Sequence, residues 1–220
     1  MNLRIATYNV HNTDGSKSIE GIAREIKSIN ADFVGLQEID VGVKRSQQKN
    51  TLGELNKICG YPSAIFSKSI DYDGGEYGIG AMFRYPLVSM QKYMLPSASE
   101  QRIIVKLVLE TEIGYISFFN THLSYRARDV RDEQFKFINS ILSKEKRFIM
   151  TGDFNIETFD ELNALDGVKC ANNKEISYNT FKSGGCIDNI IVSDNIKIKS
   201  IKLCESEYSD HNMLLADISL

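Results

Sequence analysis

The 220-residue chain is long enough to bury one sizeable hydrophobic core, so a single domain spanning residues 1–220 is expected. Its composition, 42% hydrophobic and 25% charged, is typical of a globular protein outside the membrane. A net charge of −3 argues against a broad non-specific nucleic-acid surface, which is normally basic, although a small local basic patch stays compatible with it.

The spacing of the cysteines and the N-terminal sequence argue against a zinc-cluster protein, a secreted protein and a membrane-spanning protein. The four cysteines are far apart and form no CxxC pair, so a zinc cluster is not expected. The chain enters an apolar segment at Leu3 without the longer apolar run and cleavage site of a signal peptide. No run approaches the ~18 apolar residues of a membrane span. We therefore expect a cytoplasmic protein without a membrane span.

Eleven apolar, β-branched runs predict strands. In chain order they are 3–10, 33–39, 63–70, 78–84, 87–95, 102–110, 115–123, 147–152, 186–193, 196–205 and 213–220. Four helical patterns lie between some of them, at 18–30, 51–60, 129–145 and 158–167. The second and the fourth open with Thr and Glu in capping-box spacing, at Thr51 with Glu54 and at Thr158 with Glu161.

The order of these elements predicts the fold class. Between residues 63 and 123 the strands follow one another without a helix, which is not a βαβ alternation. The pattern favours two sheets packed face to face, with helices covering the outer faces.

Polar side chains stand at or near the ends of apolar strands, where a buried carboxylate needs a partner. They are Asn9, Glu38, Asn120, His122, Asp153, Asn155, Asp188, Asp210 and His211. Taken alone, each could be a turn residue or a structural side chain whose hydrogen bonds are made within the fold. Strand ends at one rim of a sandwich can, however, bring such side chains together in one site. Carboxylates and carboxamides without a cysteine cluster suit a hard cation, Mg²⁺ or Mn²⁺. Histidines with a separate aspartate suit proton transfer and charge stabilisation on a phosphoryl group.

Two common catalytic motifs are missing from the sequence. There is no P-loop, so nucleotide-driven phosphoryl transfer of that type is not supported. There is no GxSxG elbow either, which weakens a serine-hydrolase interpretation.

An ordered set of segments resembles the endonuclease/exonuclease/phosphatase superfamily with the deoxyribonuclease-I-like fold. The segments are "TYNVHN", "GLQEID", "YGIGAMFRYPLVS", "NTHLS", "TGDFNIE", "CIDNIIVS" and "SDHNMLLADI", from residue 7 to 218. The resemblance implies a four-layer αββα sandwich, an α/β (α+β) class of fold with two mixed sheets flanked by helices. It also implies Mg²⁺-dependent hydrolysis of a phosphoester, in the manner of the small bacterial members.

The resemblance further implies a role for each site residue. Glu38 is the principal metal ligand, with Asn9 and Asp210 beside the metal. Asp153 positions and deprotonates the attacking water, although His211 is the alternative base. Asn155 and His122 hydrogen-bond the phosphoryl oxygens, and Asp188 holds the ring of His211. Asp188 beside His211 is expected to raise its pKa and keep it protonated.

Arginines near these segments suit phosphate recognition. Arg45, Arg102 and Arg126 are the candidates for substrate binding, and Arg128 and Arg131 lie in the same stretch, with a solvated face as the alternative for the last three. Asn189 stands where many relatives have Tyr or His, so the substrate-facing neighbour of Asp188 is expected to differ. Without tryptophan, any base stacking falls to tyrosines such as Tyr8, Tyr72, Tyr77 and Tyr125.

The acidic chain and its short length favour a small or lipid-like phosphodiester or phosphomonoester as substrate for a monomeric enzyme. A nuclease acting on DNA or RNA is the alternative, with the arginines as a local track for the backbone. A non-catalytic phosphate-binding module is the alternative from another class, and it is disfavoured because every expected polar position is filled. One scaffold hosts many substrates, so the resemblance leaves the substrate open.

Overall fold

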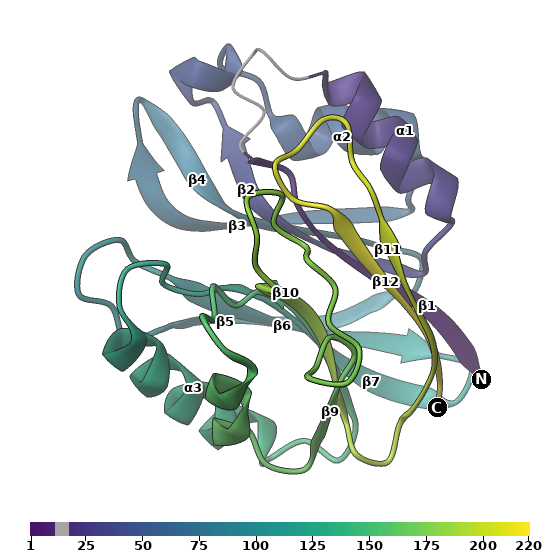
Figure 1. Ribbon diagram of the computed structural model, residues 1–220. Coiled ribbons are helices and arrows are strands. Elements are labelled where there is room, and N and C mark those ends of the chain that lie inside the picture. Colours follow the sequence, from purple (N-terminus) through teal and green to yellow (C-terminus); the bar gives the residue numbers. More distant parts are fainter. Residues whose placement is uncertain (12–17) are drawn as a thin grey trace.

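Two six-stranded β-sheets form the centre of the protein in a computed structural model, which describes residues 1–11 and 18–220 (Figure 1). The first sheet has the order β11-β12-β1-β2-β4-β3. Its strands are β1 (Asn2–Asn9), β2 (Phe33–Val41), β3 (Ser63–Tyr72), β4 (Gly75–Phe83), β11 (Lys197–Cys204) and β12 (Met213–Ser219).

The second sheet has the order β5-β6-β7-β8-β10-β9. Its strands are β5 (Leu87–Met94), β6 (Ile103–Thr111), β7 (Gly114–His122), β8 (Phe148–Asp153), β9 (Val168–Cys170) and β10 (Asp188–Ser193). The described helices are α1 (Ile19–Ile29), α2 (Thr51–Cys59), α3 (Arg128–Leu142) and two short 3-10 helices, Lys44–Ser46 and Phe159–Ala164.

Both sheets are mixed in the same way. The pairs β1–β2 and β7–β8 are parallel, and the other paired strands are antiparallel. Parallel neighbours end at the same edge of a sheet, so β1 and β2 bring Asn9 and Glu38 together, and β7 and β8 bring His122 and Asp153 together. In β7 and β8 these last two residues are direct register partners.

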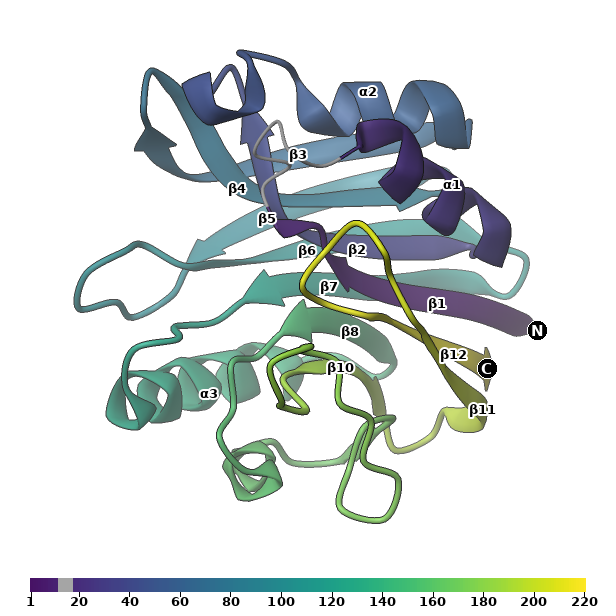
Figure 2. The same cartoon turned by 45° about the horizontal axis from the view of Figure 1, so that its top comes forward.

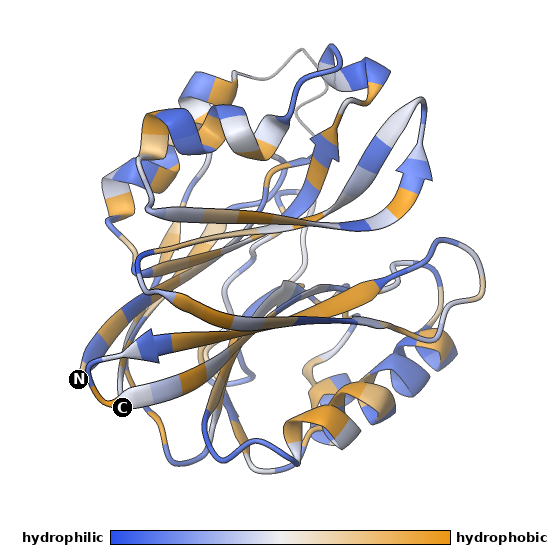
Figure 3. Cartoon of the chain, turned by 180° about the vertical axis from the view of Figure 1, so that it is seen from behind, coloured by the Kyte–Doolittle hydropathy of each residue, from blue (hydrophilic) through white to orange (hydrophobic). Residues whose placement is uncertain are grey.

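Three hydrophobic clusters divide the molecule into four layers (Figure 2). The cluster between the sheets contains Phe33 and Phe118, whose rings stack with centroids 4.7 Å apart. A second cluster joins α1 and α2 to the first sheet, and a third joins α3 to the second sheet. The outer helices carry apolar and polar residues together (Figure 3), and on α1 the buried ones form one face. The central strands β8 and β10 are instead buried along their whole length, because each lies between two layers. The predicted four-layer sandwich is therefore confirmed.

Helix ends explain where sequence and structure differ locally. The N-cap of α2 is Asn50, whose side chain accepts from the Gly53 amide, so the capping box predicted at Thr51 is wrong by one residue. The predicted capping box of Thr158 and Glu161 is present, but it opens a 3-10 helix rather than an α-helix. Among the described residues no helix is both long and apolar enough to cross a membrane.

Candidate active site

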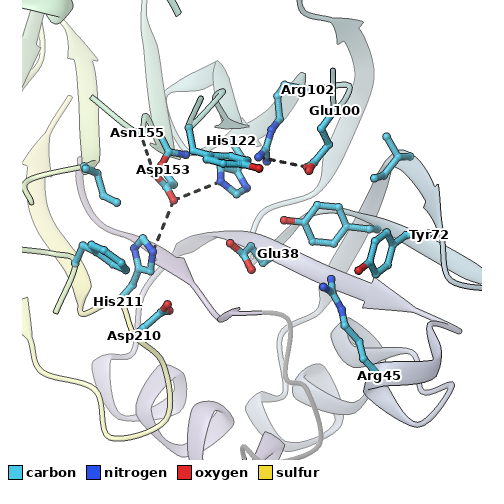
Figure 4. A pocket seen from close by; sticks show the side chains of 15 residues that line it. Glu38, Arg45, Tyr72, Glu100, Arg102, His122, Asp153, Asn155, Asp210 and His211 are labelled. Carbon is cyan, nitrogen blue, oxygen red and sulfur yellow. Dashed lines mark hydrogen bonds and ion pairs between the residues drawn. The ribbon is translucent and has the colours of Figure 1, made fainter. Parts of the chain in front are cut away.

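The predicted site residues gather around a cavity of about 490 Å³ at one rim of the sandwich (Figure 4). Both sheets and the loops between their strands contribute to its walls. The cavity is lined by Glu38, Arg45, Arg102, His122, Asp153, Asn155, Asp210 and His211, together with three of the tyrosines named above and with neighbours that the sequence did not single out. Asn9 and Asp188 lie behind this wall, where each contacts a residue that lines it.

Glu38 reaches the cavity because β2 is distorted at that residue. The pairing of β2 with β4 shifts register between Leu36 and Ile39, and Glu38 has a φ of 61°. This left-handed conformation is uncommon for a residue with a side chain and is held only where the surroundings fix it. A bulge of this kind re-aims a side chain at the end of a strand. Glu38 is thus turned into the cavity next to β1.

Asn9 connects two carboxylates that come from different sheets. Its amide nitrogen donates to Glu38 Oε1 at 3.1 Å and to Asp153 Oδ2 at 3.0 Å. Its amide oxygen accepts from the backbone N–H of His11 at 2.9 Å. Asn9 is fully buried, so these bonds fix the orientation of its side chain. In this arrangement its donors, rather than its oxygen, face the carboxylates.

Asp153 is the polar residue that most of the others contact. The backbone N–H of Asn155 donates to its Oδ1 at 3.0 Å, and His122 Nε2 and His211 Nε2 lie 3.4 and 3.8 Å from its Oδ2. Burial raises the pKa of Asp153 and the charge of Asp188 adds to the rise, against the opposing effect of His211. A carboxylate with a raised pKa is a better proton acceptor than an exposed one.

The predicted pair of Asp188 and His211 is present. Asp188 Oδ2 lies 2.8 Å from Nδ1 of His211, and both side chains are buried. Burial alone would lower the pKa of His211, but the charge and hydrogen bond of Asp188 outweigh it and raise the pKa. His211 is therefore an imidazolium at neutral pH, and its positive charge faces Asp153.

His122 differs from His211 in charge. Burial lowers its pKa well below the ordinary value, and the nearby charges of Arg102 and His211 add to the effect. The ring is neutral at neutral pH. The two histidines beside Asp153 are thus a neutral one on β7 and a charged one in the loop before β12.

The oxygen donors at the cavity fit a divalent cation of the hard type. Glu38 and Asp210 present carboxylates to the cavity, and Asn155 adds an amide side chain there. Asp153, Asp188 and His211 also place one potential ligand atom each within 4.8 Å of one another. In that second group, however, Asp188 does not line the cavity and its carboxylate holds the ring of His211. Glu38 and Asp210 present their carboxylates to the cavity itself and are therefore the better candidates for metal ligands.

Two of the candidate phosphate-binding arginines line the cavity but already contact carboxylates. Arg45 donates to both oxygens of the buried Asp40, at 2.8 and 2.9 Å, and lies against the ring of Tyr72. Arg102 is buried and lies 3.3 Å from Glu100. Their positive charge is thus largely neutralised by the protein itself.

Other candidates lie elsewhere. Arg126 is exposed and stacks over Tyr125, and it does not line the cavity. Arg131 is fully buried in ion pairs, so neither phosphate recognition nor a solvated face describes it. Asn189 is buried and exchanges hydrogen bonds with the backbone of Asn172, so the expectation that it faces the substrate is wrong.

Among the tyrosines, Tyr72, Tyr77 and Tyr125 line the cavity. Tyr8 does not: it is fully buried and its hydroxyl bonds to Glu25 and Ser206. Tyr8 is therefore a structural residue.

Some residues at the site were missed from the sequence. Glu100 lines the cavity from an irregular loop, where no pattern distinguishes it from a surface carboxylate. His11 was noted from the sequence for its place near the end of the first strand, but its ion pair with Asp210 was not expected. Phe181 contacts the ring of His211 with centroids 5.0 Å apart, but it comes from a stretch without periodicity.

Comparisons with known proteins agree with this architecture. The model of the endonuclease/exonuclease/phosphatase family matches residues 6–211. A search of curated proteins finds no match. Among solved structures, an endonuclease/exonuclease/phosphatase from Bacteroides vulgatus has 21% identity and a TM-score of 0.80, with 100% of this chain and 99% of that chain covered.

Two further solved structures are similar. A humanized TDP2 from D. rerio has 19% identity and a TM-score of 0.79, with 100% of this chain and 99% of that chain covered. The human Nocturnin catalytic domain has 22% identity and a TM-score of 0.78, with 99% and 93% covered. At these identities the likeness shows the fold alone. The family match over most of the sequence does more: the chain belongs to the endonuclease/exonuclease/phosphatase family, whose members are metal-dependent phosphoester hydrolases.

Proposed function

We propose that the protein hydrolyses a phosphodiester or phosphomonoester by metal-assisted attack of water, with a small or lipid-like molecule as substrate. The observation that carries this proposal is the environment of Asp153. Its buried carboxylate borders the cavity, with Asn9 and His122 at its Oδ2 and the imidazolium of His211 beyond them. A proton acceptor, a cationic donor and carboxylates for a cation are thus side by side.

In the proposed reaction Asp153 orients the attacking water and accepts its proton. Its raised pKa favours that transfer, and Asn9 and the Asn155 amide hold the carboxylate in place. Protonated His211 donates to a phosphoryl oxygen as charge builds, with Asp188 fixing the ring. Neutral His122 and the side chain of Asn155 add donors at the same wall.

Mg²⁺ is the proposed cofactor and Mn²⁺ the alternative, because the donors are carboxylate and amide oxygens. Glu38 and Asp210 would hold the ion, with Asn9 orienting Glu38. When bound, the cation polarises the phosphoryl group and steadies the leaving oxygen.

The arginines support the small-substrate proposal over a nuclease. A backbone track needs several exposed positive charges at the cavity, whereas Arg45 and Arg102 contact carboxylates and Arg131 is buried. Arg126 is exposed next to Tyr125 but does not itself line the cavity. The lining carboxylates Glu38, Glu100 and Asp210 add negative charge. The further phosphates of a nucleic acid would therefore add little binding energy to that of the reacting phosphate.

Hydrolysis of bis-p-nitrophenyl phosphate tests the reaction. We expect chelation to abolish it and Mg²⁺ or Mn²⁺ to restore it, and Asp153→Asn to keep the fold and lose most turnover. Full activity in excess EDTA would reject the mechanism. Stoichiometric phosphate binding without turnover would instead indicate a non-catalytic phosphate-binding module.

A panel of substrates distinguishes a hydrolase of small or lipid-like phosphoesters from a nuclease. Supercoiled plasmid, sphingomyelin or a phosphoinositide, and a set of sugar phosphates are compared at equal enzyme concentration. We expect the small or lipid-like compounds to turn over. Plasmid nicking at substoichiometric enzyme would overturn the small-substrate proposal in favour of a nuclease.

A further inference from the structure

Two buried polar residues of α3, Arg131 and Gln134, have no counterpart in the mechanism above. They lie three residues apart, so they share one face of the helix. Both are fully buried, and Arg131 is one of the largest buried side chains of the described protein. A buried guanidinium is retained only where it is paired and hydrogen-bonded. Their partners are therefore informative.

Gln134 joins two loops that border the cavity. Its side-chain oxygen accepts from the backbone N–H of Ser124 at 3.0 Å, two residues after His122. Its side-chain nitrogen donates to the carbonyl oxygen of Pro96 at 2.8 Å, in the loop that leads to Arg102. One side-chain amide thus fixes the segment after β7 relative to the segment before β6.

Arg131 holds the segment that follows Asn155. Its Nε donates to Glu161 Oε2 at 2.7 Å, and its Nη2 donates to Glu157 Oε1 at 2.8 Å. Glu161 in turn accepts from the backbone N–H of Glu157 at 2.8 Å. A further bond runs from Arg131 Nη1 to the carbonyl oxygen of Ser124 at 3.3 Å, so both residues of α3 grip the same loop.

These loops are bonded directly to the reacting groups. The carbonyl oxygen of Leu123, next to Ser124, accepts from the side chain of Asn155 at 3.0 Å. The backbone N–H of Leu123 donates to the carbonyl oxygen of Asp153 at 2.9 Å. Asn155 has a φ of 50°, a conformation that persists only when the chain on both sides is fixed. Gln134 fixes one neighbouring loop, and Arg131 fixes the other.

We propose that Arg131 and Gln134 are positioning residues that clamp three loops of the active site from the outer layer of the molecule. Neither lines the cavity, so neither touches the substrate. The clamp sets the place of the Asn155 side chain relative to Asp153 and the approach of Arg102. This inference rests on the proposed hydrolase function, because its effect on turnover presumes that reaction.

The test compares Gln134→Met with Ile138→Ala. Methionine keeps the length of the side chain and removes both hydrogen bonds. Ile138 is buried on the same helix in the apolar cluster, so its truncation loosens α3 but removes none of the hydrogen bonds from α3 to the loops. Each is assayed on bis-p-nitrophenyl phosphate well below its melting temperature. We expect Gln134→Met to lower kcat about 10- to 100-fold with little change in KM, as for small misplacements of reacting groups, and Ile138→Ala to keep kcat near wild type.

Arg131→Lys supplies a second variant, because it keeps the charge but loses the fork that spans Glu157 and Glu161. It is expected to lower kcat in the same way. Wild-type kcat in Gln134→Met, or a loss no greater than that of Ile138→Ala, would overturn the proposal.

Amide hydrogen exchange separates failure of the clamp from failure of the proposed function. We expect residues 95–101 and 123–127 to exchange faster in Gln134→Met, while the central strands stay unchanged. If the wild-type protein shows no turnover, the proposed function fails, and the exchange experiment still decides the clamp. Unchanged exchange in these loops would overturn it, as would faster exchange without loss of kcat.

Discussion

Asn9 and Asp153 are joined by a hydrogen bond of 3.0 Å, although they are 144 residues apart in sequence and belong to different sheets. The same amide of Asn9 donates to Glu38 at 3.1 Å. One neutral side chain thus separates two carboxylates that would otherwise repel each other. This side chain therefore links the two sheets at the site itself.

Asn9→Asp tests this separation, because it replaces the two donors with a third carboxylate of the same shape. A like-charge contact costs on the order of 2 kcal/mol, which lowers the melting temperature of a chain of this size by about 4–8 °C. We expect that fall in EDTA, measured by thermal unfolding. Added Mg²⁺ should raise the melting temperature of the variant more than that of wild type, since a cation offsets the extra charge. Asn50→Asp, which keeps a helix cap, is the control.

Asp188→Asn tests the charge on His211. The variant keeps the shape of the side chain but removes the carboxylate that raises the pKa of His211. We expect kcat to fall about 10²–10³-fold, the usual cost of losing a stabilising donor in the transition state. Circular dichroism should show the fold retained. Exposed Asp194→Asn is the matched control, and equal activity of the two variants would remove His211 from the mechanism.

Arg45→Met tests whether the main role of Arg45 is to neutralise the buried carboxylate of Asp40. Asp40 is fully buried, and the change leaves its carboxylate with Ser46 but without its cation. We expect a loss of about 2–3 kcal/mol in the free energy of unfolding, below the full cost of breaking a buried pair because Arg45 is partly exposed. Urea denaturation measures it. Lys44→Met removes an exposed ion pair next to it and should change stability by less than about 0.5 kcal/mol.

Glu161→Gln tests the pH dependence of stability. Burial alone would raise the pKa of Glu161, but the hydrogen bonds of Arg131 and of the backbone outweigh it and lower the pKa. Because the pKa of Glu161 is lower in the folded than in the unfolded state, its ionised carboxylate stabilises the fold above the unfolded-state pKa of ~4.3. This stabilisation is lost as the pH falls through the folded-state pKa. We expect the difference in unfolding free energy between wild type and variant to be largest near pH 7 and to shrink in acid. Exposed Glu133→Gln is the matched control.

Most strand segments along the chain and the layer plan were predictable because apolar periodicity reports burial directly, whereas it does not give the order of the strands within each sheet. Strand β9 was missed, since Val168–Cys170 is too short to show a period. The pattern at 158–167 predicted an α-helix, but the element is a 3-10 helix of six residues, which the same capping box begins. Local signals fix where an element begins better than how long it runs.

The strand-end residues from both sheets that form the site could be predicted from the sequence. The pairing of its charged side chains could not. Arg131 stands near the "THLS" segment and looks like a phosphate ligand, yet it turns inward to Glu161. Its partner lies 30 residues further along the chain, and no local pattern reveals that pairing. Glu100 was missed for the same reason, because its place at the cavity depends on loops meeting in space.

The position of β12 has a consequence for how the protein is made. This strand pairs with β1 on one side and β11 on the other, so the first described strand is joined by the last. Until residues 213–219 pair with it, β1 presents an unpaired edge to other chains. Completion of the first sheet, and with it the docking of the Asp210–His211 loop, therefore depends on pairing between strands that are far apart in sequence.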